Sequence, residues 1–327
     1  MTSRPSLLTT LALAAALWSC QVANAQLVIG RYSGEFLSLG AGARALAMGG
    51  ASVAAPTPAT ASYYNPAALA GIGKHYVEFM HASQFDNLYT YDFLSYAKPL
   101  SGGLSGAITA MYTRVGGIPV TKLSDPTQPL SDNNRVVVDH NTSDNELALV
   151  AGVGRGVGSG WRAGANAKLL FKTVAGQSAE GLGLDLGFGR TVASGLDVGL
   201  AVHDLTTSIL AWSTGLTEAI LPSADLGAAY TLDLKSVNAK VTAVGDLDSH
   251  FESRGDAEQV HAGPVSVQPQ GGLEYLISNT VALRGGYDGN TVTYGAGIRF
   301  SWLNVNAAFS NHTELGFSNR VSVGVVW

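Results

Sequence analysis

Residues 40–71, GAGARALAMGGASVAAPTPATASYYNPAALAG, decide how this chain is interpreted, because nothing after them has the same composition. Gly42, Gly49 and Gly50 allow sharp turns and close packing, and the alanine-rich runs permit only short helical turns. We therefore expect a compact segment of small residues. The chain after it is strand-like to its last residue.

Two features inside this stretch suggest how it is held. Asn65-Pro66 predicts a capped turn, with the asparagine as N-cap and the proline at the first helical position. Arg44 is a cation among alanine and glycine, so if it is enclosed it needs a carboxylate partner, for which Asp185 and Glu78 are candidates. We interpret Arg44 as an anchoring ion pair, with contact to a ligand as the alternative.

Residues 1–25 have the pattern of a secretory signal. Arg4 precedes an apolar run that ends near Trp18, and Ala-Asn-Ala at 23–25 predicts cleavage before Gln26. The only cysteine is Cys20, within a sequence that weakly resembles a lipoprotein box; lipidation there is the alternative. If cleavage follows residue 25, the mature chain has no thiol and no disulfide.

The composition suits a wall of strands in a membrane. Charged residues make up 13% of the chain and there are 40 glycines. No run of eighteen apolar residues follows the signal, so a membrane would have to be crossed by strands. The formal net charge of −5 offers no basic patch, and nucleic acid is not an expected partner.

Fourteen candidate strands follow residue 74 and predict an all-β, antiparallel transmembrane β-barrel. Their connections alternate between short turns and long segments, which is typical of outer-membrane barrels. The long segments are expected to be loops at 116–146, 206–220 and 247–267. The candidate strands are 75–84, 89–99, 103–115, 147–157, 161–173, 181–191, 195–205, 221–232, 237–246, 268–276, 280–287, 291–300, 303–310 and 317–327.

Side chains alternate along these strands, with one apolar face for lipid and one polar face for a lumen. Four polar residues are predicted to face the lumen: Arg162, Asn166, Lys168 and Asp185. No cofactor is implied. The acidic segment 124–146 lacks the spacing of a calcium loop, so no metal site is expected.

Aromatic residues stand beside the short turns. Trp161, Trp302 and Trp327 are expected to lie at the membrane interface, where amphipathic rings are favoured. The last strand ends on Trp327 with apolar residues at alternate positions before it. We expect this strand to pair with the strand that begins at His75, and to be read by the outer-membrane assembly machinery.

The motifs GARALAMGGASVA and ATASYYNPAALA resemble the PorV/PorQ family of outer-membrane barrels, which is related to the FadL transporters. LPSADLGAAYTL and GGLEYLISNTVALRGGY also resemble that family. The resemblance implies that residues 26–74 form a hatch inside a barrel made by residues 75–327. A barrel of fourteen strands is too wide to be filled by its own side chains, which agrees with this division.

The same resemblance implies two functions. The FadL relation implies passive transport of hydrophobic small molecules, and the PorV relation implies a type IX secretion accessory that docks secreted proteins. An outer-membrane scaffold is a further alternative. His81 and Ser83 could belong to a barrel lipid hydrolase, but the sequence shows no third catalytic group, so we do not expect an enzyme.

Overall fold

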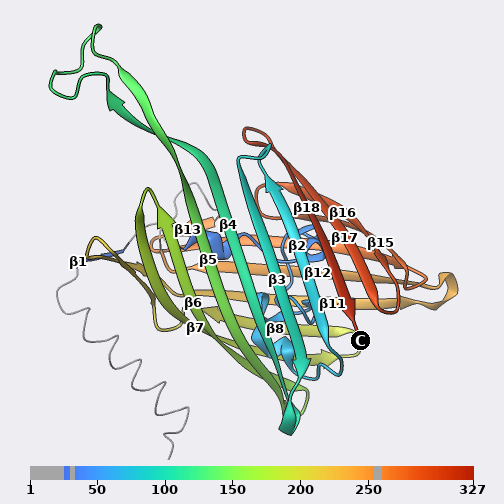
Figure 1. Cartoon of the computed structure of the whole chain (residues 1–327). Helices are drawn as coiled ribbons and strands as arrows, with labels where there is room; N and C mark the ends of the chain where they lie inside the picture. Colours follow the sequence, from blue (N-terminus) through green and yellow to red (C-terminus); the bar gives the residue numbers. More distant parts are fainter. Residues whose placement is uncertain (1–25, 30–33, 253–259) are drawn as a thin grey trace, which may run out of the picture.

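The computed structural model describes residues 26–29, 34–252 and 260–327, and most of these residues form one closed β-barrel (Figure 1). The predicted signal, the cleavage site and Cys20 lie outside the described residues. Among the residues that are described, no helix is long and apolar enough to cross a membrane.

Fourteen antiparallel strands make the wall, as the sequence predicts. Each pairs with its neighbour in the chain, except that β8 pairs with β11 and β12 pairs with β14. The wall strands are β2 (Tyr76–Gln84), β3 (Tyr89–Pro99), β4 (Leu104–Leu123), β5 (Val136–Gly158), β6 (Trp161–Val174), β7 (Gln177–Ala193), β8 (Leu196–His203), β11 (Ser223–Leu234), β12 (Ala239–His250), β14 (Val265–Ile277), β15 (Val281–Tyr287), β16 (Val292–Arg299), β17 (Leu303–His312) and β18 (Gly316–Val326).

The last strand closes the barrel against the first. β18 pairs with β2 from Val326–Tyr76 to Asn319–Ser83. The backbones of His75 and Trp327 extend this ladder with hydrogen bonds of 3.0 and 3.2 Å. The expected pairing is confirmed, and it leaves no open edge at the end of the chain.

The outer surface of the wall is apolar. Along β7, Leu182, Leu184 and Phe188 are exposed, whereas the alternating Asp185 is buried on the inner side. Short connections join the strands at one end of the barrel, which we call the short-turn end. They include the single turns η4 (Ser101–Gly103) and η5 (Lys235–Val237).

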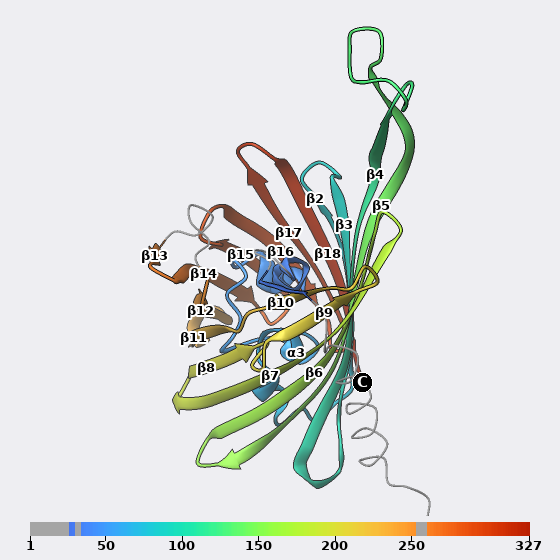
Figure 2. The same ribbon diagram turned by 90° about the vertical axis from the view of Figure 1, so that its left-hand side faces the viewer.

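The longest predicted loop is largely sheet. β4 continues as far as Leu123, and β5 begins at Val136. Together they rise as a two-stranded ribbon beyond their neighbours (Figures 1 and 2). Thus the loop expected at 116–146 is wrong over most of its length. Register shifts on either side of residues 118–120 accommodate Gly116, Gly117 and Pro119, so the two strands stay paired beyond them.

The loop expected at 206–220 is also wrong, because it contains the hairpin β9 (Ser208–Trp212) and β10 (Leu216–Ile220). β8 stops at His203, and β9 takes its place against β7. β1 (Gln26–Ile29) adds to β10 as a parallel strand. The third long segment is partly sheet, since β12 reaches His250 and β13 (Val260–Ala262) pairs with β14.

The N-terminal segment, residues 34–72, contributes only single turns. These are η2 (Glu35–Ser38), α2 (Ala43–Leu46), α3 (Ala61–Tyr64) and η3 (Pro66–Leu69). Figure 2 shows the blue turns of this segment within the ring of strands. Most of its alanines are buried against the inner side of the wall.

Candidate functional site

Glycines of the wall seat the N-terminal segment. Gly154, Gly164 and Gly187 lie in register on β5, β6 and β7, so they form one row across the inner side. A Cβ atom on any of the three would overlap the backbone or ring of Pro66. The row therefore lets the turn that begins at Pro66 approach the wall at backbone distance.

A second seat lies across the barrel. Gly272 and Gly286 are paired on β14 and β15, and a Cβ on either would overlap Met48. Gly49 has a φ of 75° and lies against the carbonyl oxygen of Tyr287, so only glycine fits there without strain. The N–H of Gly49 also donates to Thr293 Oγ1 at 2.9 Å.

Asn65 joins the N-terminal segment to itself and to the wall. Its Oδ1 accepts from the N–H of Ala67 at 3.0 Å, so the side chain caps the turn η3. Its Nδ2 donates to the carbonyl oxygens of Val53, at 3.1 Å, and of Phe188, at 3.0 Å. The residue is 2% exposed and its contacts are structural.

Arg44 forms a two-pronged ion pair with Glu274 on β14. Its Nε and Nη2 donate to the two carboxylate oxygens at 2.9 and 3.0 Å. Glu274 also accepts from Nε of Arg284 at 2.7 Å. The expected partners Asp185 and Glu78 are therefore wrong: the bidentate partner is a wall carboxylate 230 positions away in the chain.

A third polar anchor is Asp246 on β12. Its Oδ2 accepts from the backbone N–H groups of Ser52, at 2.5 Å, and Val53, at 2.9 Å. The side chain of Asn166 adds a fourth, donating to the carbonyl oxygen of Ser62 at 2.7 Å. These bonds hold the segment at a few discrete points.

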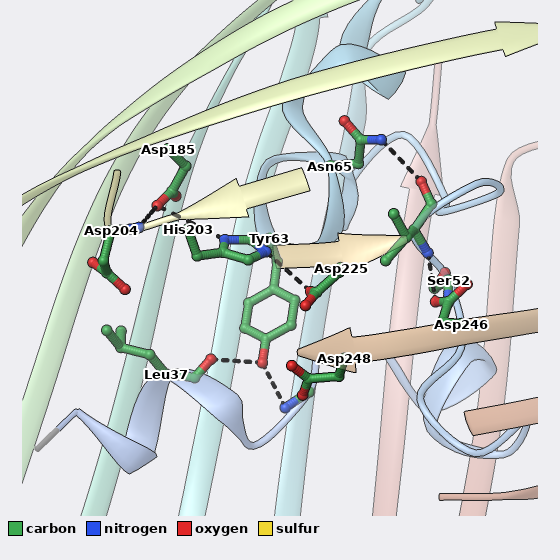
Figure 3. A network of polar contacts seen from close by, with 12 residues as sticks. Leu37, Ser52, Tyr63, Asn65, Asp185, His203, Asp204, Asp225, Asp246 and Asp248 are labelled. Carbon is green, nitrogen blue, oxygen red and sulfur yellow. Dashed lines mark hydrogen bonds and ion pairs between the residues drawn. The ribbon is translucent and has the colours of Figure 1, made fainter. Parts of the chain in front are cut away.

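A network of charged side chains lines the inner wall beside the N-terminal segment (Figure 3). Lys168 Nζ lies 2.7 Å from Asp185 and 2.6 Å from Asp204. His203 is placed between two carboxylates, with Nδ1 3.7 Å from Asp185 and Nε2 3.2 Å from Asp225. We call Asp185, Asp204, Asp225, Asp246 and Asp248 the lumenal acid cluster.

Two cavities lie on opposite sides of the N-terminal segment. The upper cavity, of about 270 Å³, is lined by the segment and by the lumenal acid cluster. The lower cavity, of about 390 Å³, is near the short-turn end and is lined by residues that include Arg44, Lys74 and Arg299. The segment thus stands between an acidic space and a largely basic one.

The tyrosines of α3 shape the upper cavity. Tyr63 donates its hydroxyl hydrogen to the carbonyl oxygen of Leu37 at 2.7 Å and accepts from the N–H of Gly40 at 2.8 Å (Figure 3). Tyr64 accepts from the N–H of Ala41 at 2.9 Å. These bonds fix η2 and the residues that connect it to α2 along the side of the cavity.

The remaining predicted residues lie apart from this cavity. Arg162 faces the inside near the short-turn end and is paired with Asp197 at 2.8 Å. Trp161, Trp302 and Trp327 are exposed beside short turns. Trp327 stacks on His75, and the guanidinium of Arg190 lies 5.0 Å from the centre of the Trp161 ring.

His81 and Ser83 do not form a catalytic pair. His81 Nδ1 lies 2.7 Å from Asp92 on the exposed outer face, whereas the hydroxyl of Ser83 donates to Asn87. Within the described part of the chain, no group of three histidine, cysteine, aspartate or glutamate side chains is arranged to hold a metal ion.

The sequence analysis predicts only Lys168 and Asp185 among the charged residues that line the upper cavity. His203, Asp225 and Asp248 alternate with apolar residues such as Val202 and Leu226, a signal that could have placed them on the inner face. Asp204 gave no such signal, because it stands where β8 ends and has a φ of 51°.

Together, a closed barrel with an apolar exterior and a polar interior defines a bacterial outer-membrane β-barrel protein. No protein-family model matches the sequence, and no curated protein matches it.

Solved structures of the same fold include a protein named as a toluene transporter and one named as a monoaromatic hydrocarbon channel. The Pseudomonas putida toluene transporter TodX is 14% identical, with a TM-score of 0.57 over 88% of this chain and 97% of its own. The monoaromatic hydrocarbon channel CymD is 11% identical, with a TM-score of 0.55 over 88% and 97%. A Pseudomonas aeruginosa FadL homologue is 12% identical, with a TM-score of 0.54 over 87% and 97%. At these identities the similarity establishes the fold, which is FadL-like.

Proposed function

We propose that this protein is a passive transporter of hydrophobic small molecules across the outer membrane, with the N-terminal segment as its hatch. The observation that carries the proposal is the position of that segment between two cavities. Movement of the segment would join the upper cavity to the lower one. The structural neighbours named as toluene transporters and monoaromatic hydrocarbon channels support aromatic hydrocarbons as the substrate class.

The way the segment is held supports a movable hatch. It packs on the wall through glycine seats and is anchored by a few polar groups, among them Glu274 and Asp246. Each charge-assisted hydrogen bond contributes roughly 1.5–3 kcal/mol. A segment held by a few such bonds can leave its place without opening the fourteen-strand wall.

Uptake by whole cells tests the proposal, because hydrocarbons cross simple lipid vesicles without a protein. Cells of a Gram-negative host that produce this protein should take up radiolabelled toluene faster than cells with an empty vector. Leu221→Trp narrows the upper cavity and should slow the uptake. Leu226→Trp is the matched control, since Leu226 is 55% exposed on the outer face. Equal uptake by producing and non-producing cells contradicts the proposal.

One observation favours a second function, the docking of secreted proteins as in a type IX secretion accessory. The ribbon of β4 and β5 projects beyond the wall, and Leu130, Val136 and Val138 on it are 68%, 53% and 60% exposed. Such an apolar surface suits contact with a protein. At the tip of the ribbon, the hydroxyl and the backbone N–H of Thr127 donate hydrogen bonds to the Asp125 carboxylate. These local bonds order the tip and hold the pKa of Asp125 below its usual range.

Removal of the ribbon separates the two functions. In the source bacterium, a variant in which residues 116–143 are replaced by a short glycine turn should still take up toluene. If the ribbon docks secreted proteins, the amount of protein anchored at the cell surface should fall in the same cells. An unchanged surface proteome contradicts the docking function and leaves transport as the function.

A further inference from the structure

Three basic side chains gather on the outer face of the wall near its short-turn end. Lys98 lies on β3, Arg155 on β5 and Arg190 on β7, so the three stand within five adjacent strands. Trp161 lies on β6, between the strands of the two arginines. It is paired with Arg190, whose guanidinium lies 5.0 Å from the centre of its ring. We call these four residues the outer basic patch.

The three basic side chains point away from the lumen. The residue directly before each of them, Ala97, Gly154 or Gly189, is buried on the inner side. Ala97 belongs to a buried cluster that includes part of the N-terminal segment, and a Cβ on Gly154 would overlap Pro66. Successive residues of a strand face opposite sides, so the bases face outward. The N-terminal segment and the outer basic patch therefore lie on opposite sides of the wall.

No carboxylate balances the patch. Among the described residues, Lys98, Arg155 and Arg190 form no ion pair. Along β3 to β8, the other outward positions near the short turns hold apolar residues or glycine. Asp197, at the same end of the barrel, is paired with the inward-facing Arg162 at 2.8 Å. The patch is thus a concentration of positive charge on an otherwise apolar surface.

The patch lies within the surface that lipid covers. Val157 and Val192, which are 58% and 54% exposed, stand between the two arginines and the short turns. Val153 and Phe188, 46% and 42% exposed, stand on the other side of them along the same strands. Long basic side chains in such a place extend to the headgroups, and tryptophan is enriched at the same level. A water-soluble protein cannot reach this position without displacing lipid, so the occupant is a lipid.

We propose that the outer basic patch binds the headgroup of an anionic phospholipid in the inner leaflet of the outer membrane. The short turns of outer-membrane barrels are periplasmic, which places the patch at the level of that leaflet. The guanidinium groups of Arg155 and Arg190 would donate to the phosphate oxygens, an acceptor that suits their geometry. The acyl chains would lie along Val153 and Phe188. This inference does not depend on the transport function.

Native mass spectrometry of the whole protein in detergent tests the proposal. The titrants are phosphatidylglycerol, which is anionic, and phosphatidylethanolamine with the same acyl chains, whose ammonium group offsets the phosphate. Phosphatidylglycerol should bind about twentyfold more tightly, and Arg155→Gln or Arg190→Gln should each weaken its binding about fivefold. Neither change should affect phosphatidylethanolamine. Arg135→Gln is the matched control, because it removes the same charge at a 75% exposed side chain on the ribbon of β4 and β5.

Heat-modifiable gel mobility shows whether each variant is folded, and Lys98→Gln replaces an arginine variant that is not. The double variant of Arg155 and Arg190 should bind the two lipids equally well. Equal affinity of the unmodified protein for both lipids overturns the proposal, and so does unchanged affinity for phosphatidylglycerol in the folded variants. A loss in Arg135→Gln as large as in Arg190→Gln also overturns it, since the attraction would then belong to the net charge of the protein.

Discussion

Arg44 is the only basic residue of the N-terminal segment, and it forms the bidentate pair with Glu274 on the wall. Its Nη1 also donates to the carbonyl oxygen of Ala55, within the segment, at 3.2 Å. Glu274 keeps Arg284 when Arg44 is removed, so the carboxylate does not become an unpaired buried charge. The energetic effect of a change at Arg44 therefore falls on the attachment of the segment rather than on the wall.

Arg44→Gln should loosen the segment by about 1.5–3 kcal/mol, the contribution of hydrogen bonds to a charged group. We expect more frequent openings in planar-bilayer recordings and unchanged heat-modifiable mobility. Arg155→Gln, at an exposed position on β5, is the control. Conductance identical to that of the unmodified protein would show that Arg44 does not hold the segment closed.

Leu184 tests the assignment of the outer face. It lies at the middle of β7 and is 46% exposed, so Leu184→Arg should place a charge at mid-membrane, which costs about 2–4 kcal/mol. Leu232→Arg is the control near the end of β11, where the cost is about 0–1 kcal/mol. The yield of heat-modifiable barrel should fall for the first variant only; equal yields contradict the assignment.

The sequence predicts which face of a strand a polar residue occupies better than it predicts the partner of that residue. Alternation alone places Asn166, Lys168 and Asp185 on the inner side, because a strand fixes which face each residue occupies. It cannot give the partner of Arg44, because closure of the barrel, rather than local geometry, brings residue 274 to residue 44. Alternation therefore predicts the face that a residue occupies, whereas its partner depends on how the barrel closes.

At the scale of elements, the glycine row under Pro66 connects strand sequence to the position of the N-terminal segment. Glycine weakens a strand, so the three aligned glycines on β5, β6 and β7 lower the stability of the wall. Their presence is explained by the close approach of another backbone, which a larger residue would prevent. The high glycine content of the sequence agrees with a β-barrel but does not say what individual glycines do. That three of them form a row against which Pro66 packs could not be predicted without the register of the strands.

Gly187→Ala should displace the turn at Pro66 and leave the strands paired. The added Cβ overlaps Asn65 and Pro66, and overpacking of this kind costs about 1–3 kcal/mol. We expect raised conductance with normal assembly. Gly285→Ala is the control, because a Cβ there would come no closer than 4.0 Å to its neighbour. Equal behaviour of the two variants contradicts a tight seat.

The elements themselves were predictable where alternation is long and turns are short. The sequence predicts all fourteen wall strands, but it predicts loops where the structure has β9, β10 and the outer parts of β4 and β5. The outer part of β4 is interrupted by Gly116, Gly117 and Pro119. β9 and β10 have five residues each, which is too short for a sustained alternation to be recognised.

At the scale of the whole molecule, closure depends on β18. Removal of residues 325–327 eliminates the pairing of Val326 with Tyr76 and the backbone hydrogen bonds between His75 and Trp327. If the assembly machinery reads this strand, the truncated protein should fail to assemble. Heat-modifiable gel mobility measures this, with Trp302→Ala as the control that removes an aromatic and keeps the strand. Normal mobility of the truncated protein contradicts the role of β18.

The division of the chain into a hatch and a barrel predicts that the barrel assembles without residues 40–71. Every wall strand lies after residue 75, and the closing ladder between β18 and β2 involves none of the deleted residues. The deletion joins the two cavities into one water-filled lumen, and liposomes carrying the shortened protein should show raised conductance. Asn65→Ala should produce a milder increase, because loss of the cap costs about 1 kcal/mol and also removes the bond to Phe188. A deleted chain that does not fold would make the segment a nucleus for the wall, and a folded chain that does not conduct would place the closure in the loops or in the lumenal charges.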